Sequence, residues 1–151
     1  MRKTLIIALC CVSMLHGAYA SYSVSRLIPA LILVESGGND KAVGDSGKAY
    51  GVLQIWNVVI LDVNRIYKTK YTHLQMFDRY SSCEVAELYL RYWGEQYEKR
   101  TGKKATYEVW AKIWNGGPKA MEATGKKKEN LDKYWKKVRK TFFTKCRSKC
   151  K

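Results

Sequence analysis

The sequence predicts a mainly α-helical domain with one small β-hairpin. Apolar and aromatic residues recur at helical spacing in several segments between residues 27 and 142, which favours helices. Three glycines, Gly44, Gly47 and Gly51, lie close together around Asp45-Ser46, which favours a hairpin or an ordered loop. With 151 residues, of which 46% are hydrophobic, the chain can bury one core.

The first twenty residues have the three parts of a secretory signal peptide. Arg2 and Lys3 form the positive start, residues 5–15 form the apolar middle, and Ala18-Tyr19-Ala20 matches a cleavage site. The apolar run is shorter than the ~20 residues that cross a bilayer, so no membrane span is expected. We therefore expect cleavage after Ala20, a secreted or periplasmic protein, and one domain over residues 21–151 with a basic C-terminal helix and tail.

The first helix of the mature chain is expected over residues 27–34, a continuous apolar run. Pro29 is tolerated near its start because the N–H groups of the first helical turn have no partners within the helix. Residues 37–40 (Gly-Gly-Asn-Asp) end this helix. The hairpin or loop is expected over residues 42–55, and a second helix over residues 58–66.

The later helices are predicted from capping residues. Ser81 and Glu84 have the spacing of a capping box, which predicts a helix that begins near Ser82. Thr106 is expected to cap a short helix that ends at residues 115–118, and Asn130 to open the last helix. The apolar residues of this last helix are spaced by four, three and four: Leu131, Trp135, Val138 and Phe142.

Positive charge is concentrated in the C-terminal third. The chain has 28 Lys+Arg against 13 Asp+Glu, a net charge of +15. Residues 101–151 hold 16 of the Lys+Arg but only 4 of the Asp+Glu. Such a segment is either a solvated helix face or a surface that attracts an anionic polymer of the cell wall or a membrane surface. No motif for reading bases accompanies the charge, so nucleic acid is not an expected partner.

Three cysteines follow the predicted signal peptide. An oxidising compartment allows one disulfide among them. Cys146 and Cys150 are four residues apart, and as helical neighbours their Cβ atoms are poorly placed for a bond. We therefore expect Cys83 to pair with Cys146 or Cys150. His73 is the one histidine after residue 20, which leaves too few ligands for zinc, so neither a metal nor a cofactor is expected.

Glu35 is the residue best suited to chemistry. It follows the apolar residues 31–34 at the end of the first predicted helix. Burial against apolar surface disfavours the charged form of a carboxyl group and raises its pKa. In glycosidases a carboxylic acid with a raised pKa protonates the departing sugar oxygen. A glutamate at a helix end is more often a surface residue, so Glu35 alone does not establish this chemistry.

Three short segments together support it. Residues 34–38 read Val-Glu-Ser-Gly-Gly, residues 50–55 read Tyr-Gly-Val-Leu-Gln-Ile, and residues 113–118 read Ile-Trp-Asn-Gly-Gly-Pro. In this order they resemble the Glu-Ser, Gly-Leu-Met-Gln and Ala-Tyr-Asn-x-Gly motifs of the lysozyme-like superfamily, specifically the soluble lytic transglycosylase (SLT) type. They are also similar to the related goose-type lysozymes. The resemblance spans about residues 27–117 and implies a lysozyme-like fold.

The resemblance also implies an activity. It indicates a lytic transglycosylase that cleaves the β-1,4 bond between N-acetylmuramic acid and N-acetylglucosamine in the glycan strands of peptidoglycan. Glu35 matches the catalytic acid, Ser36 the serine that supports bound sugar, and Gln54 the amide that hydrogen-bonds the glycan. Asn115 matches the asparagine of the third motif, and Trp114 beside it is expected to contact sugar. We expect the enzyme to act as a monomer.

Two departures from this pattern leave alternatives open. Ile113 and Trp114 replace the usual Ala-Tyr, so we expect no tyrosine hydroxyl near the catalytic acid. This absence favours the alternative of a cationic wall-binding protein that has lost turnover. Asp45 lies in a segment similar to the goose-type loop whose aspartate helps activate water, as in a hydrolytic muramidase. A transglycosylase needs no second carboxylate, because the C6 hydroxyl of its own substrate attacks C1. In that case Asp45 is a turn residue whose side chain hydrogen-bonds its own backbone.

Overall fold

The computed structural model describes residues 23–148, and their side chains as far as residue 144. The predicted signal peptide and Cys150 lie outside the described residues, as does the side chain of Cys146. Cys83 is half-buried, and its disulfide stays a prediction. Within the described residues, no helix combines the length and the apolar character that crossing a membrane requires.

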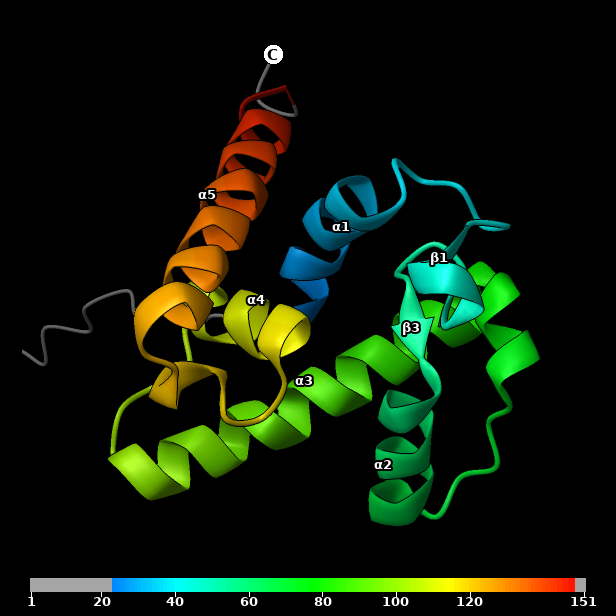
Figure 1. Cartoon of the computed structure of the whole chain (residues 1–151), viewed down its shortest axis with the longest axis horizontal. Coiled ribbons are helices and arrows are strands. Elements are labelled where there is room, and N and C mark those ends of the chain that lie inside the picture. Colours follow the sequence, from blue (N-terminus) through cyan, green and yellow to red (C-terminus); the bar gives the residue numbers. More distant parts are fainter. Residues whose placement is uncertain (1–22, 149–151) are drawn as a thin grey trace, which may run out of the picture.

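The predicted mainly α-helical fold is confirmed (Figure 1). The described residues form five α-helices: α1 (Val24–Glu35), α2 (Asn57–Tyr67), α3 (Arg79–Thr101), α4 (Tyr107–Gly116) and α5 (Gly125–Ser148). The described residues also form three short 3₁₀ turns: η1 (Asp45–Gly47), η2 (His73–Phe77) and η3 (Ala120–Glu122).

The small β element is a three-stranded antiparallel sheet in the order β1-β2-β3. Its strands are β1 (Val43–Gly44), β2 (Ala49–Tyr50) and β3 (Ile55–Trp56), and η1 connects the first two. In the register Tyr50 lies opposite both Val43 and Ile55. The predicted hairpin is therefore extended by a third strand, which leads directly into α2.

The helices and the sheet form two groups, one toward each end of α3. α1 and α4 pack against α3, and α5 packs against α1 and α4, whereas the sheet and α2 lie at the other end of α3 (Figure 1). The core is continuous between them because α1 and the segment after β2 contribute side chains that are fully buried, among them Leu27, Leu31, Val52 and Leu53. Asp132 of α5 holds α4 through Lys112, with an Nζ to Oδ1 distance of 2.7 Å.

The capping box predicted at Ser81 is wrong. α3 begins at Arg79, and the carboxylate of Asp78 accepts a hydrogen bond from the backbone N–H of Ser81 at 2.8 Å. Asp78 therefore caps the helix, and Ser81 lies inside the first turn. Glu84 does not reach back to the helix start, because its carboxylate accepts the hydroxyl of Tyr71 instead.

The start predicted for the last helix is also wrong. α5 begins at Gly125, one and a half turns before Asn130. The extra residues include Lys126–Lys128, which are good helix formers, and Lys128 pairs with Asp132 one turn later at 2.8 Å. By contrast, the cap predicted at Thr106 is confirmed, because its hydroxyl accepts a hydrogen bond from the N–H of Val109.

Candidate active site

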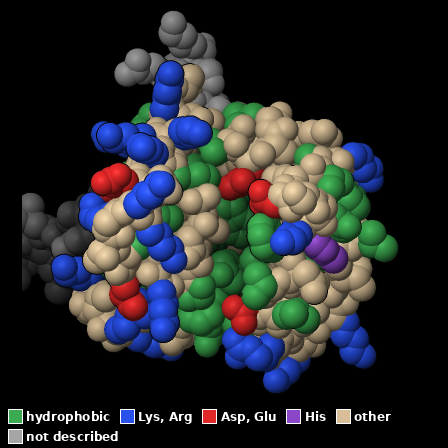
Figure 2. Space-filling model, viewed as in Figure 1, with side chains coloured by type: hydrophobic (Ala, Val, Ile, Leu, Met, Phe, Trp, Pro, Cys, Tyr) green, Lys and Arg blue, Asp and Glu red, His purple; other side chains and the backbone are tan. Residues whose placement is uncertain are grey.

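A groove separates the two groups of helices, with hydrophobic side chains on its floor and acidic side chains at one end (Figure 2). It contains a cavity of about 290 Å³. Five of the residues singled out in the sequence line it: Glu35, Asp45, Gln54, Trp114 and Asn115. Segments that are up to eighty residues apart in the chain are therefore brought to one place.

Glu35 is the last residue of α1, and the next residue fixes where this helix ends. The hydroxyl of Ser36 donates a hydrogen bond to the carbonyl of Val52 at 2.7 Å and accepts one from the N–H of Gly38 at 3.2 Å. Ser36 therefore joins the end of α1 to the segment after β2. It is not among the residues that line the cavity, so its contacts support a positioning role for Glu35.

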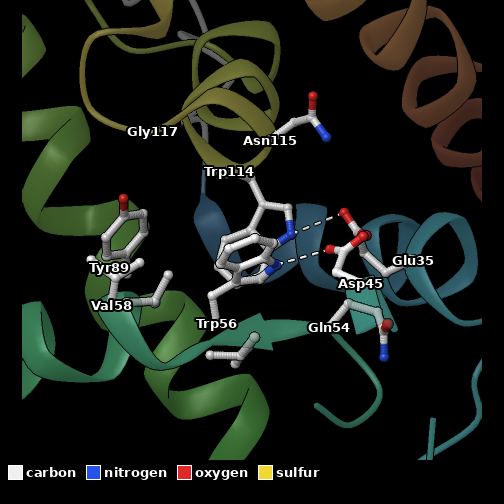
Figure 3. Close-up of a pocket in the computed structure, with 11 residues that line it drawn as sticks. Glu35, Asp45, Gln54, Trp56, Val58, Tyr89, Trp114, Asn115 and Gly117 are labelled. Carbon is white, nitrogen blue, oxygen red and sulfur yellow. Dashed lines mark hydrogen bonds between the residues drawn. The ribbon is translucent and has the colours of Figure 1, made fainter. Parts of the chain in front are cut away.

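One oxygen of Glu35 is held by two donors from different helices. Oε1 accepts the indole N–H of Trp114 (α4) at 3.1 Å and the hydroxyl of Tyr134 (α5) at 2.5 Å. Figure 3 shows the first of these bonds at the cavity wall. Among the described residues nothing is hydrogen-bonded to Oε2. When Glu35 is protonated, Oε2 is therefore the oxygen that can carry the proton into the cavity.

The surroundings of Glu35 raise its pKa above the ordinary value. Burial is the largest cause, because it disfavours the carboxylate. The hydrogen bonds from Tyr134 and Trp114 act in the opposite direction by stabilising the carboxylate, and the negative charge of Asp45 adds to the increase. Glu35 thus has the features of a proton donor that stays protonated to a higher pH than an exposed glutamate.

The expectation that no tyrosine hydroxyl lies near Glu35 is wrong. Trp114 occupies the position where the related motif has tyrosine, but Tyr134 reaches the same carboxylate from α5. Burial also raises the pKa of Tyr134. The sequence contains a signal for this residue, because Tyr134 is three residues after Leu131 and four before Val138, both of which are buried. A tyrosine on the buried face of a helix carries a hydroxyl that needs a partner.

Asp45 lies in the cavity rather than only in a turn. Its carboxylate accepts the indole N–H of Trp56 at 2.9 Å (Figure 3), and its negative charge acts on Glu35. The backbone around it is left-handed, with φ of 48° at Asp45 and 55° at Ser46. Non-glycine residues seldom adopt this conformation, and the bond to Trp56 helps to hold Asp45 in it.

The two amide residues lie at opposite sides of the cavity. Gln54 precedes β3 and has a left-handed φ of 50°. Its Nε2 donates to the carbonyl of Gly51 at 2.9 Å, so part of its hydrogen-bonding capacity is used within its own loop. Asn115 is exposed near the end of α4, beside Trp114. Both amides line the cavity.

Aromatic and apolar side chains that sequence reasoning did not select complete the cavity. Trp56 is 41% exposed, and Val58 of α2 and Tyr89 of α3 lie beside it (Figure 3). The ring of Tyr89 meets that of Trp114 edge-on, with centroids 6.2 Å apart, and burial raises the pKa of Tyr89 to about 12. No sequence pattern distinguishes these residues from core residues.

The polar groups of this site are carboxylates, amides, hydroxyls and indole N–H groups. Among the side chains that the structure describes, those of residues 23–144, no three from histidine, cysteine, aspartate or glutamate gather as ligands for a metal ion. The family model described as "Transglycosylase SLT domain" matches residues 14–136, which include Glu35, Tyr134 and the whole cavity lining. A search of curated protein sequences gave no significant match.

Proposed function

Because the chain belongs to the transglycosylase SLT domain family, a family of peptidoglycan-cleaving enzymes, we propose that Glu35 is its single catalytic acid and base. We further propose that the enzyme is secreted and cleaves the β-1,4 bond between N-acetylmuramic acid and N-acetylglucosamine. The observation that carries the proposal is the double hydrogen bond on Glu35 Oε1 at the wall of a solvent-accessible cavity.

The geometry supports two proton transfers through one carboxyl group. In the first, Oε2 of Glu35 gives its proton to the glycosidic oxygen as the bond from that oxygen to C1 breaks. Trp114 and Tyr134 stabilise the carboxylate that forms, because both donate to its other oxygen. In the second, this carboxylate takes the proton of the C6 hydroxyl as O6 bonds to C1. The product is a 1,6-anhydro sugar, and Glu35 is protonated again.

The remaining lining suits a glycan strand. The exposed indole face of Trp56 can pack against the apolar faces of sugar rings, while Gln54 and Asn115 can hydrogen-bond their hydroxyl and acetamido groups. We propose these contacts, and one between sugar and Trp114, as the means of binding. Trp114 then has two roles, since its N–H also holds Glu35.

A hydrolytic muramidase is the second candidate, and the position of Asp45 favours it. An aspartate in the cavity beside Glu35 can serve as the base that activates water. Mass spectrometry of the products from purified peptidoglycan separates the two reactions. We expect 1,6-anhydro ends. Reducing ends would instead establish the hydrolase, and no products at all would point to a wall-binding protein without turnover.

Asp45→Asn tests the same question in the enzyme. The amide keeps the size of the side chain and an oxygen that can accept the Trp56 N–H, but it cannot act as a base. In a transglycosylase we expect cleavage within about threefold of wild type and unchanged anhydro products. A fall of the 10²–10⁴-fold that is typical on loss of a general base would assign Asp45 a catalytic role.

Tyr134→Phe tests the hydrogen bond from α5. We expect roughly a tenfold loss of turnover, because one donor to the carboxylate formed in the first step is removed. The bond from Tyr134 lowers the pKa of Glu35, so its loss should raise that pKa further. The alkaline limb of the activity profile, where Glu35 loses its proton, should therefore move to higher pH. A uniform loss of activity at every pH would show that Tyr134 only supports packing.

A further inference from the structure

The outward face of α5 is an unusually dense row of positive charge. Five lysines lie opposite the buried residues Leu131 and Val138, and all five are exposed. They are Lys126, Lys133, Lys136, Lys137 and Lys140. None of the five is in an ion pair within the described residues, whereas Lys128 and Lys112, on other sides of the α4–α5 pair, are both bonded to Asp132.

This basic face lies on one side of the groove. Figure 2 shows Lys and Arg side chains gathered over α5 along one side of the groove that holds the acidic side chains. The same helix supplies Tyr134, whose hydroxyl contacts Glu35. From Lys126 to Lys140 the row is about 20 Å long, because an α-helix rises 1.5 Å per residue. It is therefore long enough to follow a polymer that lies in or beside the groove.

The chemistry of the row indicates a partner with repeated, loosely arranged anions. Lysine binds carboxylates as a flexible point charge, whereas arginine is favoured where planar, two-pronged recognition is needed. A helix that inserts into a membrane needs an apolar face directed to the lipid, but Leu131 and Val138 of α5 are buried in the core. Since the row lies along one side of the groove, groups that project from a glycan bound in the groove can reach it.

We propose that the basic face of α5 binds the carboxylates of the peptide stems on peptidoglycan, and so holds the glycan strand along the groove. The stems branch from the muramic acid units of the strand that the cavity is proposed to cleave, so this inference rests on the proposed function. Long-range attraction between the row and the polyanion also concentrates substrate at the groove.

Two quadruple variants of the purified protein, with the same change in net charge, test the proposal. The first replaces Lys126, Lys133, Lys137 and Lys140 by Gln. The control replaces Lys68, Lys70, Lys99 and Lys103 by Gln, which are exposed lysines away from α5 and without a side-chain partner among the described residues. Both are combined with Glu35→Gln so that binding is measured without digestion. Glycan strands are used after removal of secondary anionic polymers, either with their peptide stems or after an amidase has removed them.

For strands with stems, we expect the α5 variant to bind on the order of tenfold more weakly, since exposed ion pairs contribute little individually but add over four sites. Its affinity should also depend less on salt, because screening acts on the charges removed. The control should bind like its parent. On strands without stems, the α5 variant and its parent should bind equally.

Equal losses in the two quadruple variants would overturn the proposal, because net charge alone would then explain them. A loss that persists on strands without stems would overturn it too, as would stronger binding of the parent to vesicles of phosphatidylglycerol and phosphatidylcholine than to strands with stems. The proposed function fails separately, if the protein with Glu35 intact releases no anhydro products from peptidoglycan.

Discussion

Replacing Glu35 by Gln is expected to reduce peptidoglycan cleavage by at least about 10²–10⁴-fold, while binding to glycan strands persists. The amide still offers an oxygen to Trp114 and Tyr134, so the two hydrogen bonds on this side chain can form. It has no acidic proton for the glycosidic oxygen, however, and cannot take up the proton of the C6 hydroxyl. Release of soluble muropeptides measures the loss, and cleavage at the wild-type rate would contradict the assignment of Glu35.

Thermal unfolding at several pH values shows that this variant is folded and tests the environment of Glu35 independently. The folded protein raises the pKa of Glu35, so it favours the protonated form relative to the unfolded chain. Below the pKa that Glu35 has in the unfolded chain, this effect costs no stability. The free energy of unfolding then falls as the pH rises toward the raised pKa of Glu35 in the folded protein, and it stays constant above that pKa. Glu35→Gln should therefore match wild type at low pH and be more stable at neutral pH.

Replacing Gly51 by Ala is expected to destabilise the protein by about 3–5 kcal/mol, enough to abolish activity at physiological temperature. Gly51 has φ of 75°, and an added Cβ would lie 1.7 Å from the carbonyl oxygen of Met76. Because this obstacle is backbone, it cannot move aside as a side chain would. Gly51 also accepts the side-chain N–H of Gln54 and donates to the carbonyl of Ala42, so its displacement would disturb the cavity.

Gly47→Ala is the matched control for this prediction. Gly47 lies in the same sheet region and also has a positive φ, 84°, but an added Cβ there meets no atom within 4 Å. Only the cost of the left-handed conformation remains, roughly 1 kcal/mol for alanine. Chemical denaturation measures both variants. Similar losses for Gly47→Ala and Gly51→Ala would show that conformational strain, and not the approach of Met76, makes glycine necessary at position 51.

Local patterns in the sequence determined the class of fold and much of the cavity. Apolar periodicity is a property of each segment alone, which is why the helices could be predicted with errors confined mainly to their ends. Asp78 replaced Ser81 as a cap because several polar residues in succession can each serve. The three motifs likewise fixed the order of Glu35, Gln54 and Asn115 in the chain, and the structure brings these residues together.

Only the tertiary structure decided how Glu35 is held. Trp114 and Tyr134 are 79 and 99 residues away from it, and both reach the same carboxylate oxygen because α1 packs against α4 and α5. The tertiary structure also decided that the indole N–H of Trp56 donates to Asp45 and that the hydroxyl of Ser36 donates to the carbonyl of Val52. The spacing of apolar residues in a segment predicts which face of its helix is apolar, but it does not predict which other element covers that face. That choice depends on how all the helices pack together, because a buried polar group finds its partner only where two elements meet.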